Sequence, residues 1–165
     1  MLDLENLKIV AFCFDDTLFA HSKHKTESSE EEIRFLINCL LSSDGSVSRE
    51  KNWASCSINQ TIRGFMKYCS EKGIRMGLIS ASVASVCTTE KVKYTKEKYG
   101  YELCNWCVGT SDTKLKMLTA LSKAYRTSKG QILIVDDNLR IVQNAEDNGF
   151  QSATPLELIN IFANQ

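Results

Sequence analysis

Five polar side chains follow apolar runs of this sequence, at points where strands would end. Three of them are carboxylates, one is a hydroxyl and one is a lysine. Carboxylates and main-chain carbonyls are the hard oxygen ligands that Mg²⁺ prefers, while lysine and serine can hold phosphate oxygens. If they meet in one crevice, these groups predict a phosphoryl group held beside a metal ion. The residues are Asp15, Ser80, Lys114, Asp136 and Asp137.

The elements that must position these residues alternate between strands and helices. Apolar runs of strand length lie at residues 7–14, 74–80, 103–108 and 131–135. Helical patterns lie at residues 58–72, 83–99, 112–125 and 138–148, and a last helix begins at Thr154-Pro155. Ser57 is the expected N-cap of the helix at 58–72. This alternation predicts an α/β fold, a three-layer Rossmann-like parallel sheet with helices on both faces, which binds ligands at the carboxyl ends of its strands.

One segment, residues 19–57, interrupts the alternation. Its residues 21–32 are polar and of low complexity, residues 29–42 carry apolar positions at helical spacing, and residues 42–57 have no clear period. The segment is too short for a large cap domain. We therefore expect a single domain over residues 1–165, with a small helical insert or loop at 19–57 and a small or absent cap.

Composition limits the classes of partner and location. Twenty basic and twenty acidic side chains cancel, so no global field attracts nucleic acid or an anionic membrane. No apolar run approaches the ~20 residues that span a bilayer, and the N-terminal residues lack the features of a signal peptide. We expect a cytoplasmic protein whose seven cysteines are reduced. Cys104-x-x-Cys107 is interpreted as two packing thiols rather than a zinc site, since no second pair accompanies it.

Four short motifs, in order along the chain, resemble the signature motifs of the haloacid dehalogenase-like (HAD-like) hydrolase superfamily. The run Phe12–Leu18 is similar to the first, an apolar strand followed by Asp-x-Asp, a variable residue and Thr-Leu. Ser80 and Lys114 resemble the second and third motifs, and the segment 135–150 resembles the fourth. The resemblance implies a phosphatase: Mg²⁺-dependent hydrolysis of a phosphate monoester on a small molecule or a macromolecule. With a small or absent cap the crevice would be open, which resembles family members whose site is covered by a neighbouring subunit.

The resemblance implies a role for each matching residue. Asp15 corresponds to the general acid and base, and its main-chain carbonyl to a Mg²⁺ ligand. Thr17 would order the turn. Ser80 and Lys114 would bind the phosphoryl group, with Lys114 also offsetting charge among the carboxylates. The remaining metal ligands would be Asp136 and Asp137.

Cys13 stands where the superfamily has its nucleophilic aspartate. A thiol supplies neither the attacking oxygen nor a hard metal ligand, so hydrolysis is expected to be slow or lost. Thiolate attack is an alternative, but nearby carboxylates would raise the pKa of Cys13, and Phe19 stands where a cysteine phosphatase has its arginine. Asp15 as nucleophile is another, although it lies about 6–7 Å further along the strand direction. A catalytically inactive HAD-like binding or regulatory module is the alternative from a different functional class.

Overall fold

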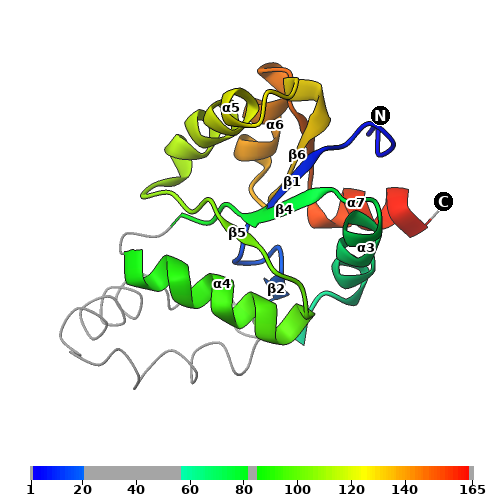
Figure 1. Cartoon of the computed structure of the whole chain (residues 1–165), viewed down its shortest axis with the longest axis vertical. Helices are drawn as coiled ribbons and strands as arrows, with labels where there is room; N and C mark the ends of the chain where they lie inside the picture. The colour runs from blue at the N-terminus through cyan, green and yellow to red at the C-terminus, as the bar shows by residue number, and fades with distance from the viewer. Residues whose placement is uncertain (1, 21–56, 82–84, 164–165) are drawn as a thin grey trace.

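A five-stranded parallel sheet forms the centre of the structure (Figure 1). The computed structural model describes residues 2–20, 57–81 and 85–163. The strands lie in the order β5-β4-β1-β6-β7, and each neighbouring pair is parallel. Their bounds are Ile9–Phe12 (β1), Arg75–Leu78 (β4), Cys104–Asn105 (β5), Ile132–Val135 (β6) and Gln151–Ala153 (β7). The predicted parallel sheet is confirmed.

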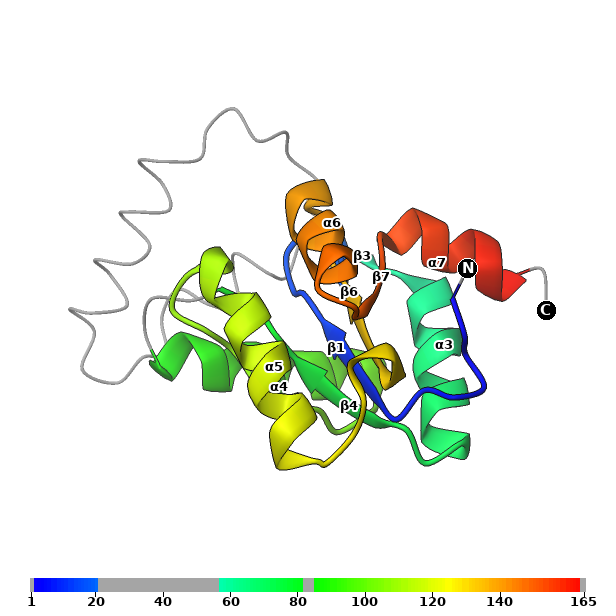
Figure 2. The ribbon, with the colours of Figure 1, turned by 90° about the horizontal axis from the view of Figure 1, so that it is seen from above.

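Helices cover both faces of this sheet. Two helices, α5 and α6, lie together on one face, and α3, α4 and α7 lie on the other (Figure 1). Figure 2 shows α3 and α7 side by side. The helices are Gln60–Glu71 (α3), Ser85–Tyr99 (α4), Lys114–Ala124 (α5), Leu139–Asp147 (α6) and Pro155–Ala163 (α7), with short 3₁₀ turns at Ser111–Thr113 (η2) and Lys129–Gln131 (η3). The three-layer Rossmann-like α/β architecture is therefore confirmed.

The central strand β1 is buried on both faces. Val10 and Phe12 belong to the apolar core under α3, α4 and α7, whereas Ile9 and Ala11 belong to the core under α5 and α6. A strand that is covered on both sides needs an uninterrupted apolar run rather than an alternating one. This requirement explains why the strand is visible in the sequence.

Within the described ranges, no helix is both long and apolar enough to cross a bilayer.

The order of the strands reverses beside β1. The chain passes from β1 through α3 to β4 and through α4 to β5, and then returns through α5 to β6 on the opposite side of β1. Open α/β sheets bind ligands outside the carboxyl ends of the strands at such a switch point. Cys13 follows β1 and Asp136 follows β6, so both lie at this point.

Two short strands, β2 (Phe19–Ala20) and β3 (Ser57–Ile58), pair antiparallel and have no counterpart in the predicted elements. Because Ser57 lies in β3, the prediction that it caps the following helix is wrong. Asn59 caps α3 instead, and its Oδ1 accepts hydrogen bonds at 3.1 and 3.2 Å from the main-chain N–H groups two and three residues later. A two-residue strand is too short to show a period in the sequence.

Most of the segment 19–57 lies outside the described residues. The predicted helix at 29–42 and the loop after it fall there, so the small insert and the single domain over 1–165 stay predictions. Residues 82–84, at the expected start of the helix 83–99, lie outside as well. The described ends of the segment are β2 and β3, which lie side by side. The chain therefore leaves and re-enters the described fold at one place, just after the turn that follows β1.

The edge strand β7 is also absent from the predicted elements. Its residues Gln151–Ala153 form no apolar run, and only the last of them is fully buried. Parallel main-chain pairing with β6 holds the strand in place, with Val135 opposite Ala153. Because main-chain hydrogen bonds do not depend on side-chain type, apolar periodicity cannot reveal such a strand.

Gly77, in β4, is expected to tolerate no side chain. A Cβ atom there would lie 2.2 Å from Cε3 of Trp106, which packs across the strand. Gly77→Ala should therefore lower the free energy of unfolding by roughly 1–3 kcal/mol, measured by urea denaturation. Gly109→Ala is the matched control, because a Cβ atom there has nothing within 4 Å. If both variants unfold at the same urea concentration, the close packing on Trp106 is not a constraint.

Candidate active site

The turn after β1 carries the first group of site residues. The main-chain N–H of Cys13 donates to the carbonyl of Val135 at 2.9 Å, which ties the end of β1 to the end of β6. The chain then turns back through Asp16, whose φ of 52° lies in the left-handed region. Aspartate is one of the few residues besides glycine that accepts this conformation readily. The turn places Asp15 and Thr17 on either side of Asp16, at the carboxyl end of the sheet.

Lys114 links the ends of β1 and β6 from the α5 face. Its Nζ donates to Asp136 Oδ2 at 2.6 Å and to Cys13 Sγ at 3.2 Å. The exposed fractions are 3% for Lys114, 1% for Asp136 and 6% for Cys13. A charged pair that is this deeply buried keeps its charge only because each ion has the other as a partner. The structure therefore brings together three residues that the motifs placed far apart in sequence.

Burial and charge set the protonation of this cluster. Burial, and after it the Asp136 carboxylate, raises the pKa of Cys13 to about 12, although Lys114 acts in the opposite direction. Burial acts to lower the pKa of Lys114, but its interactions with Cys13 and Asp136 outweigh that effect and raise the pKa. At neutral pH, Cys13 is therefore a thiol and Lys114 an ammonium. The carboxylates of Asp136 and Asp15 raise the pKa of Cys13, as the sequence analysis predicts.

The Cys13 thiol is expected to resist alkylation in the folded protein. The thiolate is the reactive form, and a pKa raised from 9.0 to about 12 lowers its population at pH 8 by roughly 10³-fold. Iodoacetamide at pH 8, followed by peptide mass spectrometry, should label Cys13 at least about 10²-fold more slowly in buffer than in urea. The partly exposed Cys104 is the internal comparison. Equal labelling rates at the two cysteines in native protein would contradict this protonation.

Thr17 and two main-chain groups fix the acidic pair after β6. The Thr17 hydroxyl accepts a hydrogen bond at 3.1 Å from the main-chain N–H of Asp137, and Asp136 Oδ1 accepts one at 3.1 Å from the N–H of Asn138. Asn138 also caps α6 by accepting from the N–H of Arg140 at 3.0 Å. The hydrogen bond between Thr17 and Asp137 thus joins the loop after β1 to the loop after β6.

The same loops hold the one group in the described residues with the spacing of a metal site. The ligand atoms of Cys13, Asp136 and Asp137 all lie within 4.8 Å of one another. The two carboxylates suit Mg²⁺, which prefers oxygen ligands. The protonated sulfur of Cys13 does not, because thiolates favour softer ions. Asp136 and Asp137 are therefore suitable magnesium ligands, and Cys13 is not.

A second cluster approaches from the α4 face, and the sequence motifs reveal only part of it. Lys91 Nζ donates to Asp15 Oδ2 and to Ser80 Oγ, both at 2.9 Å. Ser80 is 1% exposed, whereas the Asp15 side chain is 49% exposed. The sequence predicts Asp15 and Ser80 as site residues but not Lys91. The sequence gives only a weak indication that Lys91 is buried. The buried positions of α4 have helical spacing, but most of them are polar, so they differ little from the exposed positions in hydrophobicity. These positions are Thr88, Lys91, Thr95 and Tyr99.

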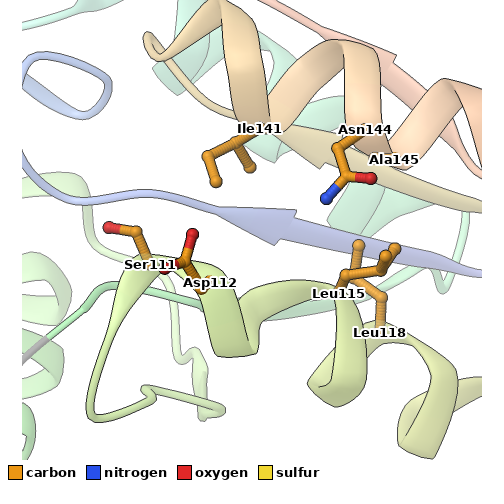
Figure 3. Close-up of a pocket in the computed structure, with 7 residues that line it drawn as sticks. All are labelled: Ser111, Asp112, Leu115, Leu118, Ile141, Asn144 and Ala145. Carbon is orange, nitrogen blue, oxygen red and sulfur yellow. The ribbon is translucent and has the colours of Figure 1, made fainter.

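A small hollow lies between the η2–α5 segment and α6 (Figure 3). One side is formed by Ser111, Asp112 and Leu115, and the other by residues of α6 such as Ile141 and Asn144. No predicted site residue lines it. The predicted residues instead form two groups at the strand ends. Cys13, Thr17, Lys114, Asp136 and Asp137 make one group, and Asp15 and Ser80 make the other through Lys91.

Comparisons with known proteins support the fold. No protein-family model matches the sequence, and no curated protein matches it. An HAD family enzyme from Bacteroides thetaiotaomicron is similar in structure with a TM-score of 0.55 and 14% identity, over 90% of this chain and 93% of that chain. That protein was crystallised as a variant with one aspartate changed to alanine, in complex with magnesium and inorganic phosphate.

Two further solved structures are similar. A 3-deoxy-D-manno-octulosonate 8-phosphate phosphatase from Moraxella catarrhalis, in complex with magnesium, phosphate and a KDO molecule, gives a TM-score of 0.51 at 16% identity, over 89% of this chain and 67% of that chain. A hypothetical protein from Xanthomonas campestris gives 0.52 at 16% identity and 90% coverage of this chain. The present chain spans only 64% of the Xanthomonas protein. At these identities the likeness establishes the fold, which is HAD-like.

Proposed function

We propose that this chain is a HAD-like phosphohydrolase that binds phosphate monoesters with Mg²⁺ and hydrolyses them slowly because Cys13 replaces the nucleophilic aspartate. The observation that carries the proposal is the contact of Lys114 with both Asp136 and Cys13, at the switch point between β1 and β6. A buried lysine and carboxylate at this point suit an oxyanion and a cation. Similar structures that contain magnesium and phosphate support the same chemistry.

Magnesium would be held by Asp136, Asp137 and the main-chain carbonyl of Asp15. When bound, it supplies positive charge to the phosphoryl oxygens. Lys114 is placed to balance charge beside Asp136, and Thr17 keeps the Asp137 loop in position through its hydrogen bond. Each of these residues acts by binding or by orientation, and none requires the side chain at position 13.

The proton and phosphoryl roles fall to the other face of the site. Ser80 would donate its hydroxyl proton to a phosphoryl oxygen, and Asp15 would give or take the proton of the leaving group or water. The half-exposed position of Asp15 suits this exchange with solvent. Cys13 limits the rate, because its thiol is protonated and offers no oxygen for attack.

The substrate that we propose is a phosphate monoester on a small molecule or a macromolecule. A second subunit could serve as a lid. A cytoplasmic location agrees with the free thiols Cys13, Cys69, Cys104 and Cys107 among the described residues. We place all of these functions in one domain with an insert at 19–57.

Phosphate binding and aryl-phosphate turnover test the proposal. A ligand present at 100 times its Kd stabilises the native state by about 2.7 kcal/mol, so inorganic phosphate with Mg²⁺ should raise the melting temperature by several degrees. Slow hydrolysis of an aryl phosphate should stop when EDTA removes the metal. If phosphate with Mg²⁺ neither shifts the melting temperature nor competes with an aryl phosphate, the proposal is wrong.

A non-catalytic binding or regulatory module is the second candidate. The observation that favours it is the protonated, buried thiol of Cys13 at the nucleophile's position. This candidate predicts no aryl-phosphate turnover and no effect of Mg²⁺ on melting. A metal-dependent stabilisation by phosphate would count against it.

A further inference from the structure

Lys91 is a second buried lysine at the carboxyl ends of the strands, and none of the recognised motifs contains it. Its side chain is 11% exposed. The Nζ atom has partners on three sides: Asp15 Oδ2 and Ser80 Oγ at 2.9 Å, and the ring of Phe14, whose centre is 4.9 Å away. Lysine is almost never buried without a partner for its charge. The partners of Lys91 are the two predicted site residues Asp15 and Ser80, so its ammonium group is held within the candidate site.

The two lysines of the site differ in what they are paired with. Lys114 and its partner Asp136 are both enclosed, with side-chain exposures of 4% and 1%. Lys91 is enclosed, but its partner Asp15 is 49% exposed. The Lys91 ammonium thus lies at the boundary between the buried interior and solvent, where an entering anion can replace or share the carboxylate's contact.

Ser80 connects Lys91 to the phosphoryl position. Its hydroxyl oxygen accepts from Lys91 Nζ and retains its own proton for donation. An oxyanion that accepts this proton would therefore lie within reach of Nζ as well. Lys91 comes from α4 on one face of the sheet, and Lys114 comes from α5 on the other. An oxyanion between them would meet an ammonium group on each side.

The charge balance of the site makes each lysine important for anion binding. The side chains at the strand ends comprise three carboxylates, Asp15, Asp136 and Asp137, and the two lysines. Without Lys91, the excess of negative charge among these groups would rise from one to two and would repel a dianion more strongly.

We infer that Lys91 is an oxyanion-binding residue of this site, which contacts the phosphoryl group together with Ser80 and opposite Lys114. The inference rests on the proposed function and specifies it: the ligand is a dianionic phosphate held by two lysines. Lys91 contributes charge and direct contact, and the metal is not its partner.

Titration with inorganic phosphate tests this role, using calorimetry on the full chain with Mg²⁺ and again with EDTA. Lys91→Gln keeps hydrogen-bond donors near Asp15 and Ser80 but removes the charge, so it should weaken phosphate binding roughly tenfold or more under both conditions. Lys91→Arg keeps the charge and should retain most of the affinity. Lys93→Met, which removes an exposed charge from the same helix, should bind as the native protein does.

The outcomes separate the inference from the function beneath it. If native protein binds phosphate and Lys91→Gln binds it equally well, Lys91 is only a structural partner of Asp15, and the inference fails alone. If Lys93→Met loses as much affinity as Lys91→Gln, the effect is one of general charge and the inference also fails. If native protein binds no phosphate, the proposed function fails together with it. If Lys91→Gln does not fold, a double variant, Lys91→Met with Asp15→Asn, replaces it, because this variant removes both members of the ion pair. Its phosphate affinity is then compared with that of Asp15→Asn alone.

Discussion

Replacing Cys13 with aspartate should raise Mg²⁺-dependent aryl-phosphate hydrolysis by at least about 10³-fold. Removing a nucleophile from an enzyme costs up to about 10⁶-fold in kcat, so restoring one should recover a large part of that factor. The new carboxylate would lie beside Lys114, which is 3.2 Å from the present sulfur, and near Asp136 and Asp137. It would supply both the attacking oxygen and a hard ligand for the metal. Initial rates at saturating Mg²⁺, compared with native protein, provide the measurement.

Two controls identify the source of this gain. Cys13→Ser has nearly the size of the native side chain but no carboxylate, and it should show no increase. Cys13→Asp combined with Asp15→Asn should lose most of the gain, because the general acid and base is then missing. A folded Cys13→Asp protein that binds phosphate but hydrolyses no faster than native would show that residue 13 is not what limits the rate.

Replacing Lys114 with methionine should have the largest effect on stability. The substitution leaves Asp136, which is 1% exposed, without the ammonium group 2.6 Å away. Breaking a buried ion pair by removing one partner costs roughly 3–5 kcal/mol, because the remaining charge is uncompensated. Urea denaturation should show this loss in the free energy of unfolding. Phosphate affinity should fall in the same variant.

A neighbouring lysine and a double variant complete this experiment. Lys116→Met alters an exposed lysine in the same helix and should change the free energy of unfolding by less than about 0.5 kcal/mol. Lys114→Met combined with Asp136→Asn removes both charges and should recover part of the lost stability. If the double variant is no more stable than Lys114→Met, the loss comes from packing rather than from the unpaired carboxylate.

The parts of the fold with a strong apolar signal were predictable from the sequence. The strands β1 and β6 are buried on both faces, so both are continuous apolar runs. The parallel direction of the predicted strands follows from their alternation with helices, whereas the order of the strands came only from the structure. The contact of Lys114 with Asp136 could be anticipated, because both residues follow strands that end at one edge of the sheet. The roles given to these residues remain predictions that the experiments above address.

Other features could not be predicted, for physical reasons. The strands β2 and β3 and the polar edge strand β7 are held by main-chain hydrogen bonds, which leave no periodic trace in side-chain type. Lys91 is one of several lysines in α4, and only the packing of that helix turns it inward while Lys93 stays exposed. The pKa of Cys13 likewise depends on burial, which the sequence does not give.

The pairing of β2 with β3 determines where residues could be inserted into or deleted from this chain without disturbing the parallel sheet. Antiparallel partners lie only about 5 Å apart, so Ala20 and Ser57 could be joined by a tight turn. The entropic cost of closing a flexible connection between two such positions grows slowly with its length, by about 0.6 kcal/mol for each doubling. Insertions or deletions between these two residues would therefore leave the register of the parallel sheet unchanged. A shortened protein that lacks residues 21–56 is a natural route to a minimal version of this domain.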